Sequence, residues 1–156
     1  MMKRSAFFKF VAASVFALFL GGLSTAIAAE HPGKSTLEHP GKAITSDSVK
    51  KAVRDYVSAQ TKAGGGVYVV KDPMLNKDWR LRLDKIHDPV REFQKDGKTI
   101  YFACSDFKTE DGKDVLDIDL WMVEKGGKLE VTDTKIHKVN GEPRYTYEGT
   151  ALKPVK

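Results

Sequence analysis

The sequence predicts an α+β fold in which one N-terminal helix packs on a four- to five-stranded antiparallel meander sheet. Apolar residues recur at helical spacing over residues 49–60, directly after residues that can cap a helix. Three glycines at 64–66 end that pattern, and apolar and polar side chains then alternate up to residue 147. Turn dipeptides divide this second part at intervals of about fifteen residues, as in a run of consecutive hairpins.

The helix is predicted from its start signal, its apolar stripe and its stop signal. Residues 45–48 are Thr-Ser-Asp-Ser, which offer several oxygens for an N-cap. The glycines at 64–66 end the helix after four to five turns. Its apolar stripe must lie against another element. The stripe consists of Val49, Ala52, Val53, Tyr56, Val57 and Gln60.

The strands are predicted from period-two alternation bounded by turn dipeptides. Each dipeptide supplies the positive φ angles that tight hairpin turns need, so successive strands should run antiparallel. The dipeptides are Asp96-Gly97, Asp111-Gly112, Gly126-Gly127 and Asn140-Gly141. The expected strands are Val67–Val70, Trp79–His87, Lys98–Phe107, Asp114–Glu124, Lys128–Val139 and a weaker Arg144–Tyr147.

One face of this sheet should pack on the helix and the other should be partly open. We expect Leu116, Ile118, Leu120, Met122, Ile100, Phe102 and Cys104 on the helix side, and Tyr101 and Phe107 on the opposite side. Aromatic residues mixed with arginines on an exposed sheet are typical of a ligand or partner surface. The alternatives are that strand propensity alone places aromatics there, or that a loop or the N-terminal arm covers them. The predicted surface consists of Arg80, Arg82, Tyr101, Asp117, Asp119 and Trp121.

The order of elements from Thr45 to Tyr147 resembles the cystatin-like architecture and also looks like small exported bacterial proteins of unknown function. The resemblance implies a fold of one helix and a meander. It implies no protease inhibition, because the Gln-x-Val-x-Gly hairpin of cystatin-type inhibitors is absent.

Residues 1–28 are predicted to be a secretory signal peptide. A basic start precedes an apolar run from Phe10 to Leu20, and an Ala-x-Ala site ends at Ala28. The alternative is an uncleaved anchor from Phe10 to Ala29, which two glycines and a Ser-Thr pair disfavour. We therefore expect a periplasmic or secreted protein with no membrane insertion after cleavage. It should comprise a flexible arm at 29–44, one domain at 45–150 and a C-terminal tail at 151–156.

The charge of the mature chain argues against a nucleic-acid partner. Three of the 26 basic residues lie in the signal peptide, so about 23 basic and 21 acidic residues remain. The single cysteine, Cys104, cannot form an internal disulfide and is expected to be a buried thiol, the alternative being a reactive or intermolecularly bonded one.

The arm carries the pentapeptide Glu-His-Pro-Gly-Lys twice, at 30–34 and 38–42. Cleavage after Ala28 would leave Ala29, Glu30 and His31 at a free N-terminus, a spacing that suits square-planar copper(II) or nickel(II). The repeat can instead be a docking tag or a duplication with no role.

Three weaker hypotheses concern chemistry inside the domain. His87 with Asp84 or Asp88, and His137 with Asp133, are candidate acid–base pairs, against ordinary surface hydrogen bonding. Asp117 and Asp119 project from one side of a strand and are a candidate cation site, against a solvated face balanced by Arg80, Arg82 or Lys135. A faint resemblance to a calcium loop at 106–114 fits a hairpin tip better.

Together these patterns indicate an exported accessory or binding protein, with an unknown protein or small molecule as its partner. It would act through the open sheet face or the arm. Copper or nickel binding at the N-terminus is the second hypothesis and an enzyme with a histidine–carboxylate pocket the third.

Overall fold

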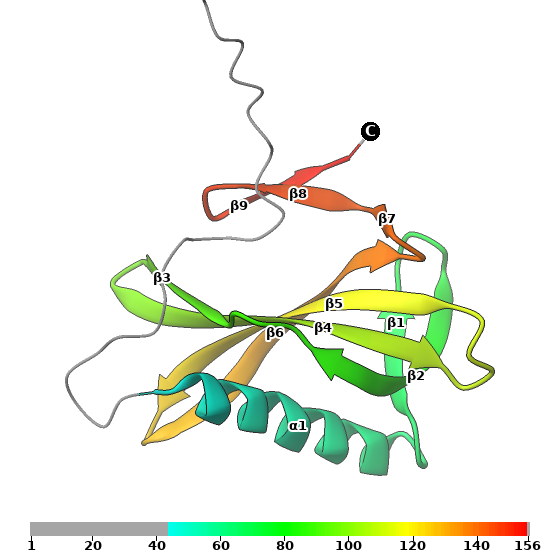
Figure 1. The fold of residues 1–156 in the computed structure, drawn as a ribbon, viewed down its shortest axis with the longest axis horizontal. Helices are drawn as coiled ribbons and strands as arrows, with labels where there is room; N and C mark the ends of the chain where they lie inside the picture. Colours follow the sequence, from blue (N-terminus) through cyan, green and yellow to red (C-terminus); the bar gives the residue numbers. More distant parts are fainter. Residues whose placement is uncertain (1–43, 156) are drawn as a thin grey trace, which may run out of the picture.

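The computed structural model describes residues 44–155 and confirms an α+β fold: one helix packs against a seven-stranded antiparallel sheet curled into a half-barrel (Figure 1). The helix α1 is Ser46–Ala63. The sheet strands are β1 (Tyr68–Asp72), β2 (Lys77–Ile86), β3 (Arg91–Lys95), β4 (Lys98–Thr109), β5 (Val115–Lys125), β6 (Lys128–Val139) and β7 (Glu142–Pro143). A separate C-terminal hairpin consists of β8 (Tyr145–Glu148) and β9 (Ala151–Pro154).

The helix begins and ends where the sequence predicts. Thr45 is the N-cap: its side chain accepts a hydrogen bond from the Ser48 amide at 3.2 Å, and Ser48 Oγ accepts one from the Thr45 amide at 2.8 Å. Gly64 ends the helix with a hydrogen bond from its amide to the Gln60 carbonyl. The buried stripe of Val49, Val53 and Val57 lies against the sheet.

The strand order is β1-β2-β4-β5-β6-β7, with β3 paired to β4 beside β2. β2 pairs with residues 105–109 of β4 and β3 with residues 98–102, so β2 and β3 share one edge of β4. β3 was not predicted from the sequence, because Phe93 is its single large apolar residue and no alternation marks it. Of the six strands expected by residue range, five belong to this seven-stranded sheet, and the sixth, Arg144–Tyr147, corresponds to β8 of the separate hairpin.

The register between β4 and β5 decides which side chains share a face. Phe107 lies opposite Leu116 and Tyr101 opposite Met122, so both aromatics belong to the helix face of the sheet. Phe102 lies opposite Trp121 on the other side, which we call the outer face.

The prediction for β5 is therefore confirmed and that for β4 is wrong. Leu116, Ile118, Leu120 and Met122 are fully buried beneath the helix, as expected. Tyr101 and Phe107 do not lie with Trp121, and Phe102 and Cys104 do. Residues 100–104 are apolar on both sides, so β4 carries no alternation that distinguishes its faces.

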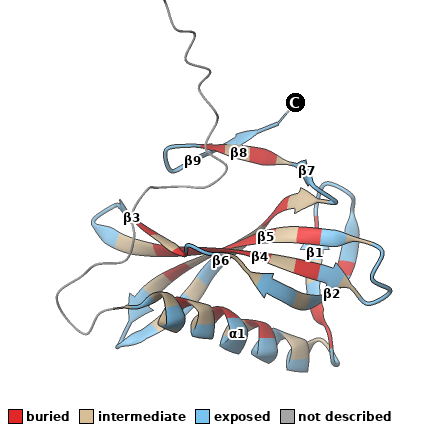
Figure 2. Cartoon of the chain, viewed as in Figure 1, coloured by how far each residue is buried: buried red, intermediate tan, exposed pale blue. Residues whose placement is uncertain are grey.

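The outer face is covered, which corrects the expectation of an open surface. The hairpin β8–β9 lies over it (Figure 1), and Figure 2 shows buried residues on β8 as well as on the sheet below. Tyr145 and Tyr147 of β8 form a second core with Phe102 and Cys104, against which Trp121 packs. Residues 151–154, expected as part of a tail, are the second strand of this hairpin.

No helix within residues 44–155 has both the length and the apolar character that crossing a membrane requires.

Candidate functional site

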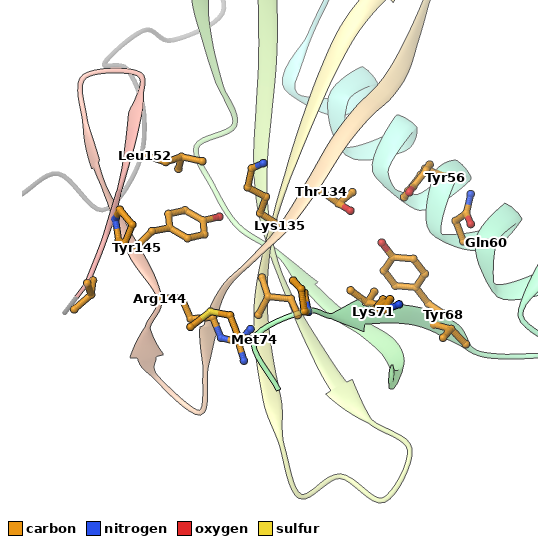
Figure 3. A pocket seen from close by; sticks show the side chains of 16 residues that line it. Tyr56, Gln60, Tyr68, Lys71, Met74, Thr134, Lys135, Arg144, Tyr145 and Leu152 are labelled. Atoms are coloured by element: carbon orange, nitrogen blue, oxygen red, sulfur yellow. The ribbon is translucent and has the colours of Figure 1, made fainter. Parts of the chain in front are cut away.

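The candidate site is a pocket of about 720 Å³ between the two edges of the half-barrel, which we call the seam pocket. Curling of the sheet brings the edge strand β1 opposite β6, so that Tyr68 of β1 and Thr134 of β6 both line the pocket. The helix closes one end and the C-terminal hairpin the other (Figure 3). Residues from all four elements line it, among them Tyr56, Gln60, Tyr68, Lys71, Thr134, Lys135, Tyr145 and Leu152.

Exposed apolar side chains gather at this pocket. Among the described residues, six large apolar side chains are exposed, and four of them line the seam pocket. Met74 is the most exposed, at 70%. Apolar surface gathered around a concavity is typical of a ligand or partner site. The four are Val69, Met74, Leu152 and Val155.

The charged groups in the lining are all basic. Lys135 Nζ lies 2.9 Å from Asp133 Oδ2, and the guanidinium of Arg144 is held by Asp72. Lys71 forms no ion pair with another described residue. Its ammonium group is therefore available to an anionic ligand at the mouth of the pocket.

The wall beside the pocket is fixed by a buried charged pair. Arg144 donates two hydrogen bonds to Asp72, from Nη1 to Oδ1 at 2.8 Å and from Nη2 to Oδ2 at 2.7 Å. Trp79 Nε1 donates a third, at 2.8 Å. The hydrogen bonds from Arg144 are the largest cause that holds the pKa of Asp72 well below its usual range.

The predicted surface residues do not form one site. Arg80 Nε lies 2.5 Å from Glu110 Oε2, and Arg82 Nη2 lies 3.9 Å from Glu110 Oε1, all three on the exposed end of the sheet. Tyr101 is buried on the helix face. Trp121 is half-buried on the outer face, with its ring centre 5.5 Å from that of Phe102.

Asp117 and Asp119 do lie together, but in the protein interior and not on a solvated face. Asp119 is fully buried, and its Oδ2 accepts hydrogen bonds from Tyr147 at 2.6 Å and Tyr145 at 2.9 Å. The thiol of Cys104 donates to Asp117 Oδ1. Arg80, Arg82 and Lys135, expected to balance these carboxylates, form their ion pairs elsewhere.

Burial is the largest cause of the pKa shifts of Asp117, Asp119 and Cys104. It raises the pKa of Asp119 to about 7 and also raises the pKa of Asp117. Burial, together with the neighbouring carboxylates, raises the pKa of the Cys104 thiol far above its ordinary value. Cys104 is thus buried, as expected, but next to polar groups and not in the main apolar core.

The histidines have partners other than those expected. His137 Nδ1 lies 3.5 Å from Asp119 Oδ2 and 3.7 Å from Asp117 Oδ2, while Asp133 bonds Lys135. His87 Nε2 lies 2.9 Å from Asp106 Oδ2. The prediction therefore identified His137 and the carboxylate pair separately but did not bring them together.

A β-bulge lies at His137. Ile136 pairs with Ile118 and Lys138 with Asp117, so His137 is the additional residue between these two pairs. A strict period of two has no such residue, and nothing in the sequence marks the bulge.

Lys71, Met74, Arg144 and the two hairpin tyrosines were not among the site residues predicted from the sequence. Tyr145 and Tyr147 do alternate, which is the one signal that could have placed both on a single face. Ala29, Glu30 and His31, predicted to bind copper or nickel, lie outside the described residues.

No family model, no curated protein and no solved structure matches the chain.

Proposed function

We propose that the chain is an exported binding protein that holds a small amphipathic organic anion in the seam pocket. The observation that carries the proposal is the gathering of exposed apolar side chains around a pocket of about 720 Å³ whose charged lining residues are basic. This volume falls within the usual range for sites that take drug-sized ligands, about 300–1,000 Å³.

The lining suits a ligand with two unlike ends. Val69 and Met74 offer apolar contacts near β1, and Leu152 and Val155 offer them from the hairpin side. Lys71 offers the positive charge for an acidic group. An apolar or aromatic body with a carboxylate or sulfonate satisfies both features.

The other polar groups in the lining favour specific binding of one ligand over nonspecific adsorption of apolar molecules. Tyr56 and Tyr68 lie edge to face with ring centres 6.2 Å apart, beside Gln60 and Thr134. Burial raises the pKa of Tyr68, so its hydroxyl stays neutral and can donate a hydrogen bond.

Export is part of the proposal and rests on the signal-peptide pattern of residues 1–28, which assigns the protein to the periplasm or the outside of the cell. The cystatin-like description enters as an order of elements and brings no activity with it. An enzyme is not proposed, because neither His87 nor His137 lines the seam pocket.

Two fluorescent probes of similar size test the proposal. 1-Anilinonaphthalene-8-sulfonate is anionic, and N-phenyl-1-naphthylamine has the same framework without the sulfonate. We expect saturable binding of the anionic probe at one site per chain, with a blue shift of its emission, and weaker binding of the neutral probe.

Matched variants assign the binding to the pocket. Lys71→Gln should weaken the anionic probe about three- to fivefold, the effect of one partly exposed charge pair, and leave the neutral probe unchanged. Met74→Ser should weaken both probes. The control is Leu75→Ser, which changes an exposed neighbour that is not part of the lining. Non-saturable binding, or equal binding by Lys71→Gln and the unmodified chain, would overturn the proposal.

A further inference from the structure

Four potential metal ligands lie close together beneath the C-terminal hairpin. This cluster is independent of the ligand-binding function proposed for the seam pocket. Cys104 comes from β4, Asp117 and Asp119 from β5, and His137 from β6, three adjacent strands of one sheet. One ligand atom from each lies within 4.8 Å of all the others. The site therefore needs no rearrangement of distant elements.

The distances from the His137 nitrogen to the two carboxylates suit one small cation. A tetrahedral zinc ion has bonds of about 2.0–2.3 Å, which places its ligand atoms about 3.3–3.8 Å apart. His137 Nδ1 lies 3.5 Å from Asp119 Oδ2 and 3.7 Å from Asp117 Oδ2. Both values fall in that range.

One buried oxygen in the cluster, Asp119 Oδ1, lacks a hydrogen-bond partner. Asp119 is fully buried, yet its Oδ1 accepts no hydrogen bond. An unsatisfied buried acceptor costs about 1–3 kcal/mol, and more when it carries charge, so such atoms are rare without an ion or water beside them. A cation within the cluster supplies the missing interaction.

The side chains around Asp119 hold the proposed metal ligands in position. Tyr145 and Tyr147 donate to Oδ2 and fix the carboxylate in place. Tyr145 also stacks on the His137 ring, with ring centres 4.8 Å apart. Groups that orient ligands in this way are typical of metal sites.

The bulge in β6 points to the same site. Bulges bend a strand locally and are common next to functional sites. Here the additional residue is His137, the one imidazole in the cluster.

We propose that Cys104, Asp117, Asp119 and His137 bind a divalent transition-metal ion of the zinc(II) class. A thiolate and an imidazole select such an ion over calcium or magnesium, which prefer oxygen ligands alone. Binding replaces the S–H bond of Cys104 by a sulfur–metal bond and releases the proton to solvent, with no change of oxidation state.

The site is closed, so its role is structural. Four protein ligands complete a tetrahedron, and Tyr145 and Tyr147 cover it, which leaves no open position for a substrate. The ion joins three strands of the sheet directly and holds the hairpin through the tyrosines. Because these rings cover the ligands, the ion should enter as the chain folds or when the hairpin lifts.

Cobalt(II) tests the site with a signal that no other part of the chain can give. Cys104 is the only cysteine, so a thiolate-to-cobalt charge-transfer band in the near ultraviolet can arise at this site alone, whatever the histidines of the N-terminal arm bind. We expect this band, with visible bands of tetrahedral cobalt, to saturate at one ion per full-length chain refolded with cobalt chloride. Zinc chloride should remove it.

The variants distinguish a metal site from a structural cluster. Cys104→Ser should abolish the charge-transfer band, and His137→Gln should remove it or shift its visible companions. The control His87→Gln changes a histidine that pairs with Asp106, outside the cluster, and should leave the bands intact. Zinc should raise the melting temperature of the unmodified chain and not that of Cys104→Ser.

Two results would overturn the proposal. One is a folded, full-length chain that shows no charge-transfer band after refolding with excess cobalt. The other is a His137→Gln variant in which the charge-transfer band and the visible bands both persist unchanged. If variants fail to fold, zinc-edge X-ray absorption of the unmodified chain decides: one sulfur with nitrogen and oxygen ligands supports the site, and an all-nitrogen-and-oxygen shell contradicts it. None of these results depends on probe binding in the seam pocket.

Discussion

Arg144 forms a two-pronged salt bridge with Asp72, with nitrogen–oxygen distances of 2.8 and 2.7 Å, and so ties the start of the C-terminal hairpin to the end of β1. Asp72 is fully buried and the Arg144 side chain is 12% exposed. The pair therefore links the two segments that flank the seam pocket.

Removal of one partner of this pair should destabilise the fold strongly. Arg144→Ala leaves the Asp72 carboxylate buried without its main partner, a change that typically costs about 3–5 kcal/mol. The control is Arg80→Ala, whose ion pair with Glu110 is exposed and should contribute at most about 1 kcal/mol. Urea unfolding measures both, and equal losses would contradict the role assigned to Arg144.

The salt bridge between Arg144 and Asp72 should make the stability of the fold depend on pH. The folded-state pKa of Asp72 lies below its unfolded value of about 3.9, so its contribution is complete above that value. The contribution is lost as the pH falls through the lower, folded-state pKa. Melting temperatures from pH 6 to pH 2 should fall less steeply for Asp72→Asn than for the unmodified chain. Parallel curves would refute this assignment.

Gly64 should tolerate no side chain. A Cβ at this position would lie 2.3 Å from the Val67 carbonyl oxygen, where the chain leaves the helix for β1. Gly64→Ala should thus shift the turn and lower the free energy of unfolding by more than Gly65→Ala. Gly65 has a φ of +70° and open space around it, so alanine there costs about 1 kcal/mol of backbone strain alone. Thermal unfolding compares the stability of the two variants. A Gly64→Ala variant more stable than Gly65→Ala would show that the turn accommodates a Cβ at Gly64.

The hairpin should protect the thiol of Cys104. This residue is 5% exposed and lies beneath Tyr145 and Tyr147. In the full chain it should react with Ellman's reagent only as fast as the protein opens. Deletion of residues 145–156, which keeps Arg144, should expose the thiol together with Phe102 and produce rapid labelling. Rapid labelling of the intact chain would mean that the hairpin does not cover this face in solution.

The sequence predicted the elements better than it predicted their faces. α1 and five of the sheet strands follow from periodicity, caps and turn dipeptides, because these signals are local. The face of Tyr101 depends on how β4 pairs with β5, and β4 is apolar on both sides, so local alternation cannot assign it.

The candidate sites depended on contacts between distant residues. Asp117 and Asp119 could be paired because they are two positions apart on one strand. His137 joins them through a bulge, and Tyr145 and Tyr147 join them through a hairpin that folds back over the sheet. The seam pocket arises from the curl that brings β1 opposite β6, a tertiary feature with no local signature.

The most direct test of ligand binding at the seam pocket is a nitrogen–proton correlation spectrum of the labelled protein, titrated with 1-anilinonaphthalene-8-sulfonate. We predict saturable shifts confined to amides of β1, β6, the C-terminal hairpin and the pocket-lining residues of α1, including those of Val69, Lys71 and Lys135. Shifts centred on the exposed side of α1 or on β3, with these amides unchanged, would contradict the proposed site.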